Sequence, residues 1–213
     1  MNAELPEEVP YACHCCARAG RKRANAYHLA VIAGFQGESG AFSELAVRAL
    51  LGEVEARGYR TFEQVVAALE SAQVDCAVLP HENTLHGPIP AVRDLVAGRS
   101  ALRIAGEVGI PIEQCLIAMP DANVESIERV ASHPVALTQC RRFLQQHAQW
   151  AVAVSDDTAG AVREMMEQRR LRSAAIGPAM AAERYGARVL LRGIQDDALN
   201  VTKFWLVTRN AGA

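Results

Sequence analysis

The chain has 213 residues, 50% of them hydrophobic, which is enough for one sizeable domain or two small lobes. Its formal net charge of −2 and pI near 6.3 give no electrostatic footprint for nucleic acid or for an anionic membrane surface. No apolar stretch approaches the roughly 20 residues of a membrane span, and the acidic start of the chain does not resemble a secretory signal. We therefore expect a soluble cytoplasmic protein that binds neither nucleic acid nor membrane.

The first segment of the chain, residues 1–28, combines cysteine with basic residues. Cys13, Cys15 and Cys16 surround His14, but zinc sites usually combine one such pair of ligands with a second, distant pair. The other three cysteines lie in or beside apolar runs, as buried cysteines do. We predict no metal site, and we expect residues 1–28 to form a flexible extension.

From residue 29 onward, short apolar runs alternate with helical stretches. The predicted strands are residues 29–35, 54–60, 76–79, 102–108, 115–118, 151–154, 174–176, 189–191 and 205–207. The predicted helices are residues 42–51, 62–71, 89–97, 124–130, 135–147, 159–168 and 179–185. Thr61 with Gln64 forms a capping box, Asp157 or Thr158 caps a later helix, and Gly186 suits a helix end. This alternation predicts βα units with mainly parallel sheets.

Two turn-rich stretches, residues 106–111 and 193–200, indicate where the chain crosses between two lobes. Two crossings make the first lobe discontinuous, formed by residues 29–109 and 193–209, with a second lobe of residues 110–192 inserted into it. The predicted fold is therefore two α/β lobes with mainly parallel sheets around a central cleft. A ligand would bind in that cleft, where strand ends and helix starts converge.

Polar clusters follow two of the early predicted strands. In residues 35–44, two glycines permit a tight turn, and Ser39, Ser43 and the first N–H groups of the next helix can receive a carboxylate. An ordinary strand-to-helix turn is the alternative. In residues 80–88, Asn83 and Thr84 supply donors while Glu82 or His81 can titrate. The alternative there is a solvated loop whose side chains bond their own backbone.

Two further clusters lie at predicted helix starts. Ser132 and Gln139 point into one crevice if the helix that follows residue 134 directs its N-terminus at the cleft. A nucleophilic pair of Ser132 and His133 is disfavoured, because adjacent strand residues point to opposite faces. The alternative role for Ser132 is a helix cap. Capping likewise accounts for Asp157 and Thr158, with ligand binding by Thr158 as the other reading.

The last cluster, residues 196–204, stands directly before the apolar run 205–207. An amide, a hydroxyl and a cation fixed at a strand end can orient an acidic substrate. Residues 200–204 resemble the Asn-Val-Thr-Arg-Phe signature of prephenate dehydratases, with Lys203 in place of Arg. Other motifs are similar to that family in order and spacing over residues 31–207: residues 36–44, 82–84, 106–108, 132–134 with 139–140, and 157–159.

This resemblance to the catalytic domain of prephenate dehydratases implies two α/β lobes similar to a type II periplasmic binding protein. It implies a carbon–oxygen lyase that converts prephenate to phenylpyruvate, water and carbon dioxide in phenylalanine biosynthesis, without cofactor, nucleotide or metal. Thr202 would be the catalytic residue, a hydrogen-bond donor to the leaving hydroxyl, with Glu82 or His133 as a proton relay. The implied substrate ligands are Asn83, Thr84, Ser132, Gln139, Thr158, Lys203 and Phe204, the last as a wall for the ring.

The sequence departs from the family pattern in three ways. Lys203 has a single ammonium charge where arginine has a planar guanidinium that can form two parallel hydrogen bonds. Lysine would bind a substrate carboxylate more weakly than arginine, but it would change little in a structural ion pair. Thr84 replaces the more usual Ser and keeps the hydroxyl. The chain stops six residues after Val207, where most bacterial members continue into an ACT domain. We therefore expect no ACT domain and no feedback inhibition by phenylalanine on this chain, and we expect a homodimer.

Three other functions remain open at this stage. The enzyme can act on arogenate, which carries an amino group where prephenate has a keto group. It can be a non-aromatising prephenate decarboxylase, which retains the hydroxyl. Outside the enzymes, a two-lobed clamp can hold an aromatic acid without turning it over. Retention of Thr202 and the intervening motifs favours the dehydratase.

Overall fold

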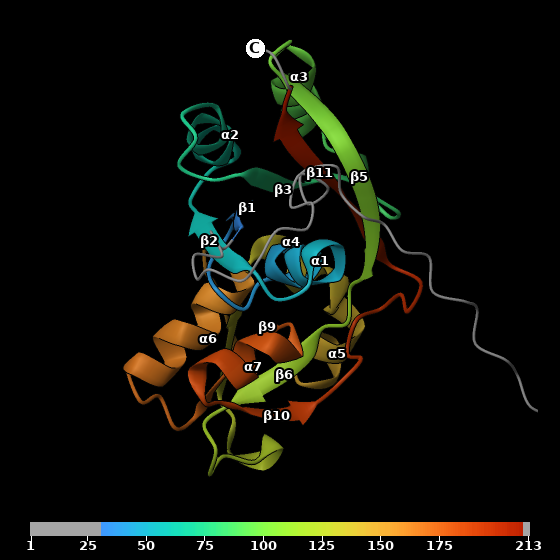
Figure 1. Cartoon of the computed structure of the whole chain (residues 1–213). Helices are drawn as coiled ribbons and strands as arrows, with labels where there is room; N and C mark the ends of the chain where they lie inside the picture. The colour runs from blue at the N-terminus through green and yellow to red at the C-terminus, as the bar shows by residue number, and fades with distance from the viewer. Residues whose placement is uncertain (1–30, 211–213) are drawn as a thin grey trace, which may run out of the picture.

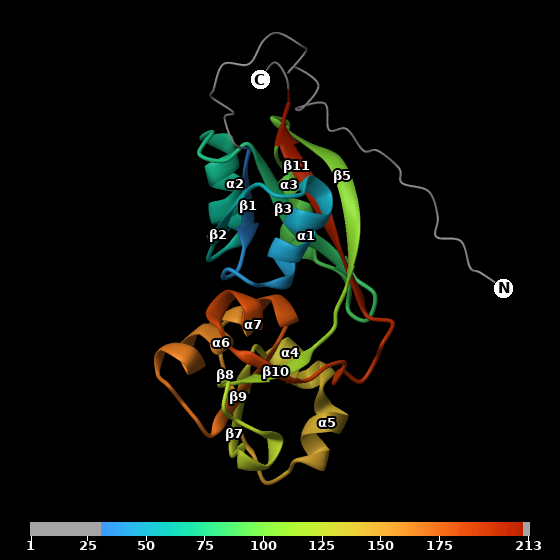
Figure 2. The ribbon, with the colours of Figure 1, turned by 60° about the horizontal axis from the view of Figure 1, so that its bottom comes forward.

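The computed structural model describes residues 31–210, so the predictions for the cysteine-rich start fall outside the described residues. Within this range the chain forms the two α/β lobes predicted from the sequence, which lie end to end (Figures 1 and 2). No helix among residues 31–210 is long and apolar enough to cross a membrane.

The first lobe contains a six-stranded sheet in the order β2-β1-β3-β11-β5, with β4 beside β3. α1 (Phe42–Leu51) covers one face around Phe35 and Phe204, while α2 (Phe62–Glu70) and α3 (Pro90–Ala97) cover the other around Leu79. The strands are β1 (Ile32–Gln36), β2 (Glu55–Tyr59), β3 (Cys76–Asn83), β4 (Gly87–Pro88), β5 (Leu102–Pro111) and β11 (Val201–Arg209).

The second lobe contains a five-stranded sheet in the order β10-β6-β9-β7-β8. α4 (Pro134–Gln139) and α5 (Arg141–Gln146) pack on one face, and α6 (Thr158–Glu167) and α7 (Ala179–Tyr185) pack on the other. The strands are β6 (Cys115–Ala118), β7 (Arg129–Ser132), β8 (Ala151–Val154), β9 (Ser173–Gly177) and β10 (Arg188–Leu191).

The chain crosses between the lobes twice, from β5 to β6 through residues 112–114 and from β10 to β11 through residues 192–200. The first crossing lies later than the predicted stretch 106–111, because β5 stays in the first sheet as far as Pro111. The sheets are mixed, not mainly parallel: β11 runs antiparallel to β3 and β5, and β6 runs antiparallel to β9 and β10. A strand that enters from the other lobe needs no crossover helix, so nothing in the connection makes it parallel.

Side-chain caps begin three of the seven α-helices of residues 31–210, namely α2, α4 and α6. The Thr61 hydroxyl accepts the Gln64 backbone N–H at 3.3 Å, and the Asp157 carboxylate accepts that of Gly160 at 2.8 Å. The helix predicted for residues 124–130 is wrong, since only a 3₁₀ turn forms (Val124–Ser126) and β7 follows it. The helix predicted for residues 135–147 breaks at Cys140 into α4 and α5.

Candidate active site

A cavity of about 320 Å³ lies between the two lobes, within the size range of small-molecule pockets. The strand ends of the first lobe and the helix starts of the second lobe both contribute side chains to it. It is lined by Phe42, Asn83, His86, Ile89, Ile112, Gln114, His133, Val135, Ala136, Gln139, Thr158 and Thr202. Five residues that the sequence singled out for catalysis, ligand binding or proton relay therefore meet here: Asn83, His133, Gln139, Thr158 and Thr202.

Asn83 and Thr202 form the polar centre of the cavity on the side of the first lobe. They lie directly opposite each other on β3 and β11, and Asn83 Nδ2 donates to Thr202 Oγ1 at 2.9 Å and to Asn200 Oδ1 at 2.7 Å. Asn83 Oδ1 accepts the backbone N–H groups of Leu85 and His86 at 3.0 and 3.2 Å. Because those two groups can only donate, they fix which end of the Asn83 amide carries oxygen.

This arrangement determines what the Thr202 hydroxyl can do. Its oxygen accepts from Asn83, and its hydrogen has no acceptor among residues 31–210. The O–H group is therefore oriented and free to donate to a molecule in the cavity. A hydroxyl is too weak an acid to release its proton, so it acts as a positioned hydrogen-bond donor.

A β-bulge in β3 gives Asn83 its direction. Phe204 pairs with Pro80 but Lys203 pairs with Glu82, so His81 is an extra residue in β3. Side chains on a regular strand alternate between faces. Here His81 and Glu82 both bond the same arginine of α3, so consecutive side chains point to one face of the sheet. The next residue along β3 then faces the cavity.

Lys203 and Glu82 lie on the α3 face of the sheet, away from the cavity. Lys203 Nζ is 2.8 Å from Glu82 Oε1, and Arg93 Nη2 is 2.7 Å from Glu82 Oε2. The hydrogen bond from Lys203 is the main cause that lowers the pKa of Glu82. The expected roles of Lys203 as a substrate ligand and of Glu82 as a proton relay do not fit these positions, because strand alternation turns Lys203 away from Thr202.

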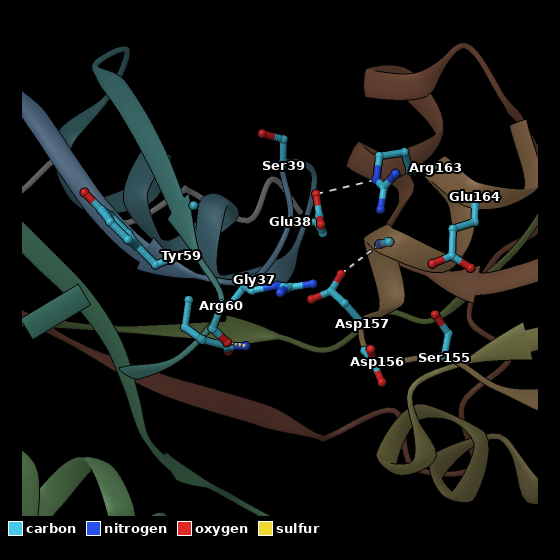
Figure 3. A pocket seen from close by; sticks show the side chains of 13 residues that line it. Gly37, Glu38, Ser39, Tyr59, Arg60, Ser155, Asp156, Asp157, Arg163 and Glu164 are labelled. Carbon is cyan, nitrogen blue, oxygen red and sulfur yellow. Dashed lines mark hydrogen bonds and ion pairs between the residues drawn. The ribbon is translucent and has the colours of Figure 1, made fainter. Parts of the chain in front are cut away.

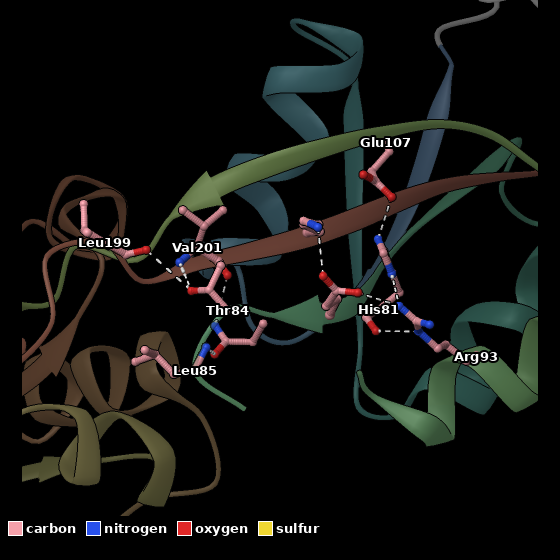
Figure 4. Close-up of polar contacts among 10 residues, drawn as sticks. His81, Thr84, Leu85, Arg93, Glu107, Leu199 and Val201 are labelled. Carbon is pink, nitrogen blue, oxygen red and sulfur yellow. Dashed lines mark hydrogen bonds and ion pairs between the residues drawn. The ribbon is translucent and has the colours of Figure 1, made fainter. Parts of the chain in front are cut away.

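Three other predicted ligands also make contacts outside the cavity. The Thr84 hydroxyl accepts the Val201 backbone N–H at 2.9 Å and thereby ties the β3 end to β11 (Figure 4). The fully buried Ser132 hydroxyl donates to the Ile176 carbonyl at 2.6 Å. Phe204 is 2% exposed and packs in the core under α1. These side chains hold the walls of the site in place.

The sequence reading missed several lining residues, of which Gln114 is the most informative. It is 2% exposed, and its Nε2 donates to Gln139 Oε1 at 3.2 Å. Within the described part of the chain, Gln114 Oε1 has no hydrogen-bond partner. A polar amide directly before the apolar run 115–118 was an available signal. The apolar lining residues, such as Phe42 and Ile112, carry no comparable signal, because they resemble ordinary core positions.

The cavity is lined by no Lys or Arg among residues 31–210, so an anion bound there would accept hydrogen bonds from uncharged donors. The starts of α1, α4 and α6 reach the cavity at Phe42, Val135 and Thr158, and helix N-termini favour negative charge. His133 Nδ1 accepts the Val135 backbone N–H at 3.2 Å, so the hydrogen of the neutral ring lies on Nε2. The described residues contain no group of three or more His, Cys, Asp or Glu side chains that could hold a metal ion.

Beside this cavity, the β1–α1 turn of the first lobe packs against α6 and α7 of the second. The Tyr185 hydroxyl donates to the Ser39 carbonyl at 2.8 Å, and Glu38 is 3.6 Å from Arg163 (Figure 3). A second cavity of about 640 Å³ opens next to this contact, with polar and charged residues from both lobes. The turn at residues 35–44 therefore joins the lobes, and only Phe42 of this stretch lines the smaller cavity.

The position of Lys203 leads to a first prediction. Replacing it with Arg or Ala should leave KM for the substrate unchanged, because the side chain does not reach the cavity. Lys203→Ala should lower the melting temperature at neutral pH, because it removes a partner of Glu82. As the folded-state pKa of Glu82 is depressed, this stabilisation exists above the ordinary carboxyl pKa of about 4.3 and is lost as the pH falls further. A raised KM for Lys203→Ala with unchanged kcat would contradict this placement.

Comparisons with known proteins agree with the geometry. The family model for prephenate dehydratase matches residues 33–212. Arogenate dehydratase 1 of Petunia hybrida is 41% identical over 176 residues, which cover 82% of this chain and 41% of that protein. A bifunctional N-acyl-homoserine lactone acylase/prephenate dehydratase of Komagataeibacter europaeus is 34% identical over 178 residues, covering 84% of this chain and 63% of that protein.

A similar solved structure is the prephenate dehydratase of Arthrobacter aurescens in complex with L-Phe. It has a TM-score of 0.78 and 28% sequence identity, and the match covers 85% of this chain and 61% of that chain. The chain thus spans less than two thirds of each of these three relatives. With most of its length matched by the family model, the chain belongs to the prephenate dehydratase family.

Proposed function

We propose that this chain is a carbon–oxygen lyase that converts prephenate, or its amino analogue arogenate, to an aromatic product with loss of water and carbon dioxide. The proposal rests mainly on the Thr202 hydroxyl. Its oxygen accepts a hydrogen bond from Asn83, and its hydrogen is available to a molecule bound in the cavity between the lobes. The family membership supplies the reaction class, and the position of Thr202 supplies the donor that this reaction needs.

The proposed reaction requires the protein to orient the substrate and to supply one hydrogen-bond donor to the leaving group. The bond between the ring and its carboxylate breaks, its electron pair enters the ring, and the carbon–oxygen bond on the far side of the ring breaks. The departing hydroxide takes up a proton from solvent and leaves as water. A hydrogen bond from Thr202 to that oxygen stabilises the charge that develops there, and Asn83 orients the donor.

The remainder of the cavity suits a dicarboxylate with a ring. Apolar side chains such as Ile89 and Ile112 can pack on the ring, and the starts of α4 and α6 can receive a carboxylate. The Nε2–H of His133 is an additional donor in the lining. Holding the substrate between two lobes fixes its orientation, which by itself can account for a large part of a rate enhancement.

A binding protein without turnover is the alternative from another class, because a two-lobed clamp can hold an aromatic acid. The free donor on Thr202 favours the enzyme, since loss of the substrate hydroxyl needs a hydrogen-bond donor and Asn83 holds the Thr202 oxygen in place. A non-aromatising decarboxylase would keep the substrate hydroxyl and would not need that donor.

The deciding experiment incubates the purified chain with prephenate at neutral pH and follows phenylpyruvate, with arogenate and phenylalanine measured in parallel. We expect an aromatic product from at least one substrate, at a rate that depends on Thr202. A Thr202→Ala control corrects for the spontaneous aromatisation of prephenate in acid. Binding of prephenate without consumption would favour the binding protein, and consumption without an aromatic product would favour the decarboxylase.

A further inference from the structure

His81, the extra residue of the β3 bulge, is a buried histidine that the proposed chemistry does not use. Its side chain is 4% exposed and stacks on Trp205 of β11, with ring centroids 4.2 Å apart and an interplanar angle of 9°. Nε2 lies 2.8 Å from Glu107 Oε2 on β5, and Nδ1 lies 3.3 Å from Arg93 Nη2 on α3. Figure 4 shows His81 between Glu107 and Arg93. One ring therefore contacts three other elements of the first lobe.

The two partners determine the protonation state of this ring. Arg93 can only donate, so Nδ1 accepts from it and carries no hydrogen. Nε2 then carries the hydrogen of the neutral ring and lies 2.8 Å from the Glu107 carboxylate, without the geometry of a hydrogen bond. The contact at Nδ1 requires the neutral form, because a second hydrogen on Nδ1 would face the Arg93 guanidinium.

The backbone of His81 is linked to the candidate active site through Ile89 and through Asn83. Its carbonyl accepts the backbone N–H of Ile89 at 2.8 Å and the Nε–H of Arg93 at 3.1 Å, and Ile89 lines the cavity. Two residues further along β3, Asn83 holds the Thr202 hydroxyl. His81 thus fixes the bulge that turns Asn83 toward the cavity.

We propose that His81 is a positioning residue, which pins the β3 bulge so that Asn83 presents the Thr202 hydroxyl to the substrate. This inference deepens the proposed function and rests on it for its kinetic part. Without the anchor, the bulge can migrate or disappear along β3. A shift of one residue in strand register turns each side chain to the opposite face of the sheet, which would carry Asn83 away from the cavity.

The contacts of the His81 ring that hold the bulge depend on pH. Burial, which outweighs the opposing effect of Glu107, lowers the pKa of His81, in keeping with the neutral form that its partners require. The charged groups around it are Glu107 on β5, Arg93 on α3 and Glu82 on β3. Because the folded-state pKa is depressed, the contribution of His81 is complete above the ordinary histidine pKa of about 6.5 and is lost as the pH falls below it.

The experiment compares His81→Phe with His147→Phe. Phe at position 81 keeps an aromatic ring against Trp205 but removes both nitrogen contacts. His147 is the matched control, because it also stacks on a tryptophan, Trp150, at 4.1 Å, but lies in the second lobe away from the cavity. We expect His81→Phe to lower kcat by about 10- to 100-fold, with KM little changed, since small misplacements of reacting groups cost that much. His147→Phe should leave kcat unchanged.

A readout that needs no turnover separates this inference from the proposed function. The side-chain amide NMR signals of Asn83 should shift in His81→Phe and stay in place in His147→Phe, whether or not the chain is active. If His81→Phe fails to fold, Glu107→Ala takes its place. Glu107 is half exposed, so its substitution should be tolerated, and the variant lacks the carboxylate that lies beside His81 Nε2. An unchanged Asn83 signal together with wild-type kcat would overturn the role of His81. Shifted signals in a chain that consumes neither substrate would overturn the proposed function and leave the positioning role supported.

Discussion

Thr202→Ala should lower kcat for the preferred substrate by about 100-fold or more, the usual cost of removing a donor from a developing oxyanion. Among the described residues, the Thr202 hydroxyl accepts from Asn83, and its hydrogen has no acceptor in the protein. The fold should survive, because the Asn83 amide keeps Asn200 as an acceptor and both backbone donors to its oxygen. Product formation by Thr202→Ala would be measured against the spontaneous reaction at the same pH.

Two further variants at this position distinguish hydrogen bonding from packing. Thr202→Val keeps the shape of the side chain and loses the hydroxyl, so it should be as inactive as Thr202→Ala. Thr202→Ser keeps the hydroxyl and should retain measurable turnover. Substrate affinity, measured by calorimetry on the inactive variants, should remain near that of the wild type. An active Thr202→Val would remove Thr202 from the mechanism.

Much of the fold follows from local signals in the sequence. The predicted bounds of α1 and α7 are those observed, and Thr61 and Asp157 cap the helices that were predicted to follow them. The failure at residues 124–130 has a local cause as well. Asn123 and Ser126 close a one-turn capping box, after which Val130 joins the sheet as part of β7. A helical spacing of apolar residues cannot by itself show that the next turn is replaced by a strand.

The candidate site was predictable only in part. Asn83 and Thr202 stand in conspicuous polar clusters, and the resemblance to a known family marks both. Lys203 and Phe204 stand in the same cluster, yet alternation along β11 turns Lys203 to the opposite face, and Phe204, on the face of Thr202, packs in the core under α1. A bulge without glycine leaves no mark in the sequence, because it depends on how two strands pair and not on which residue is inserted.

The mixed sheets show a similar limit. β11 is contributed by the last stretch of the chain, and it lies between β3 and β5 in the sheet of the first lobe. Periodicity predicts that a strand exists, but its direction depends on the long-range return from the second lobe. That return is also what brings Thr202 beside Asn83, more than a hundred residues away in the sequence. The proximity of Asn83 and Thr202, on which the proposed function rests, is therefore a consequence of topology.

Gly40→Ala should reduce turnover sharply by preventing the two lobes from meeting. Gly40 has a φ of +91°, and a Cβ at this position would lie 2.8 Å from Ala181 Cα, a backbone atom of α7 that cannot rotate aside. The turn that contains Gly40 leads directly into α1, whose first residue Phe42 lines the cavity. Displacing it would separate the walls of the site. We expect kcat/KM to fall by about 100-fold, in line with the cost of a 1 Å misplacement.

Gly52→Ala is the matched control for this variant. Gly52 also has a positive φ, +69°, but a Cβ there would have no atom within 4 Å. Both substitutions force alanine to a positive φ, which disfavours alanine relative to glycine, so backbone strain is present in both variants. Only Gly40→Ala adds a clash between the lobes.

Because each lobe has its own hydrophobic core, Gly40→Ala should disturb the contact between the lobes without unfolding either lobe. Each lobe buries its own hydrophobic clusters, around Leu79 and Phe204 in the first and around Ile176 and Val162 in the second, where Ala41 of the β1–α1 turn also packs. The clash should therefore open the hinge through residues 112–114 and 192–200 and leave both lobes folded. Small-angle scattering should show a larger radius of gyration for Gly40→Ala than for Gly52→Ala, with equal circular dichroism. Equal scattering and equal kcat/KM for the two variants would mean that this contact does not control closure of the site.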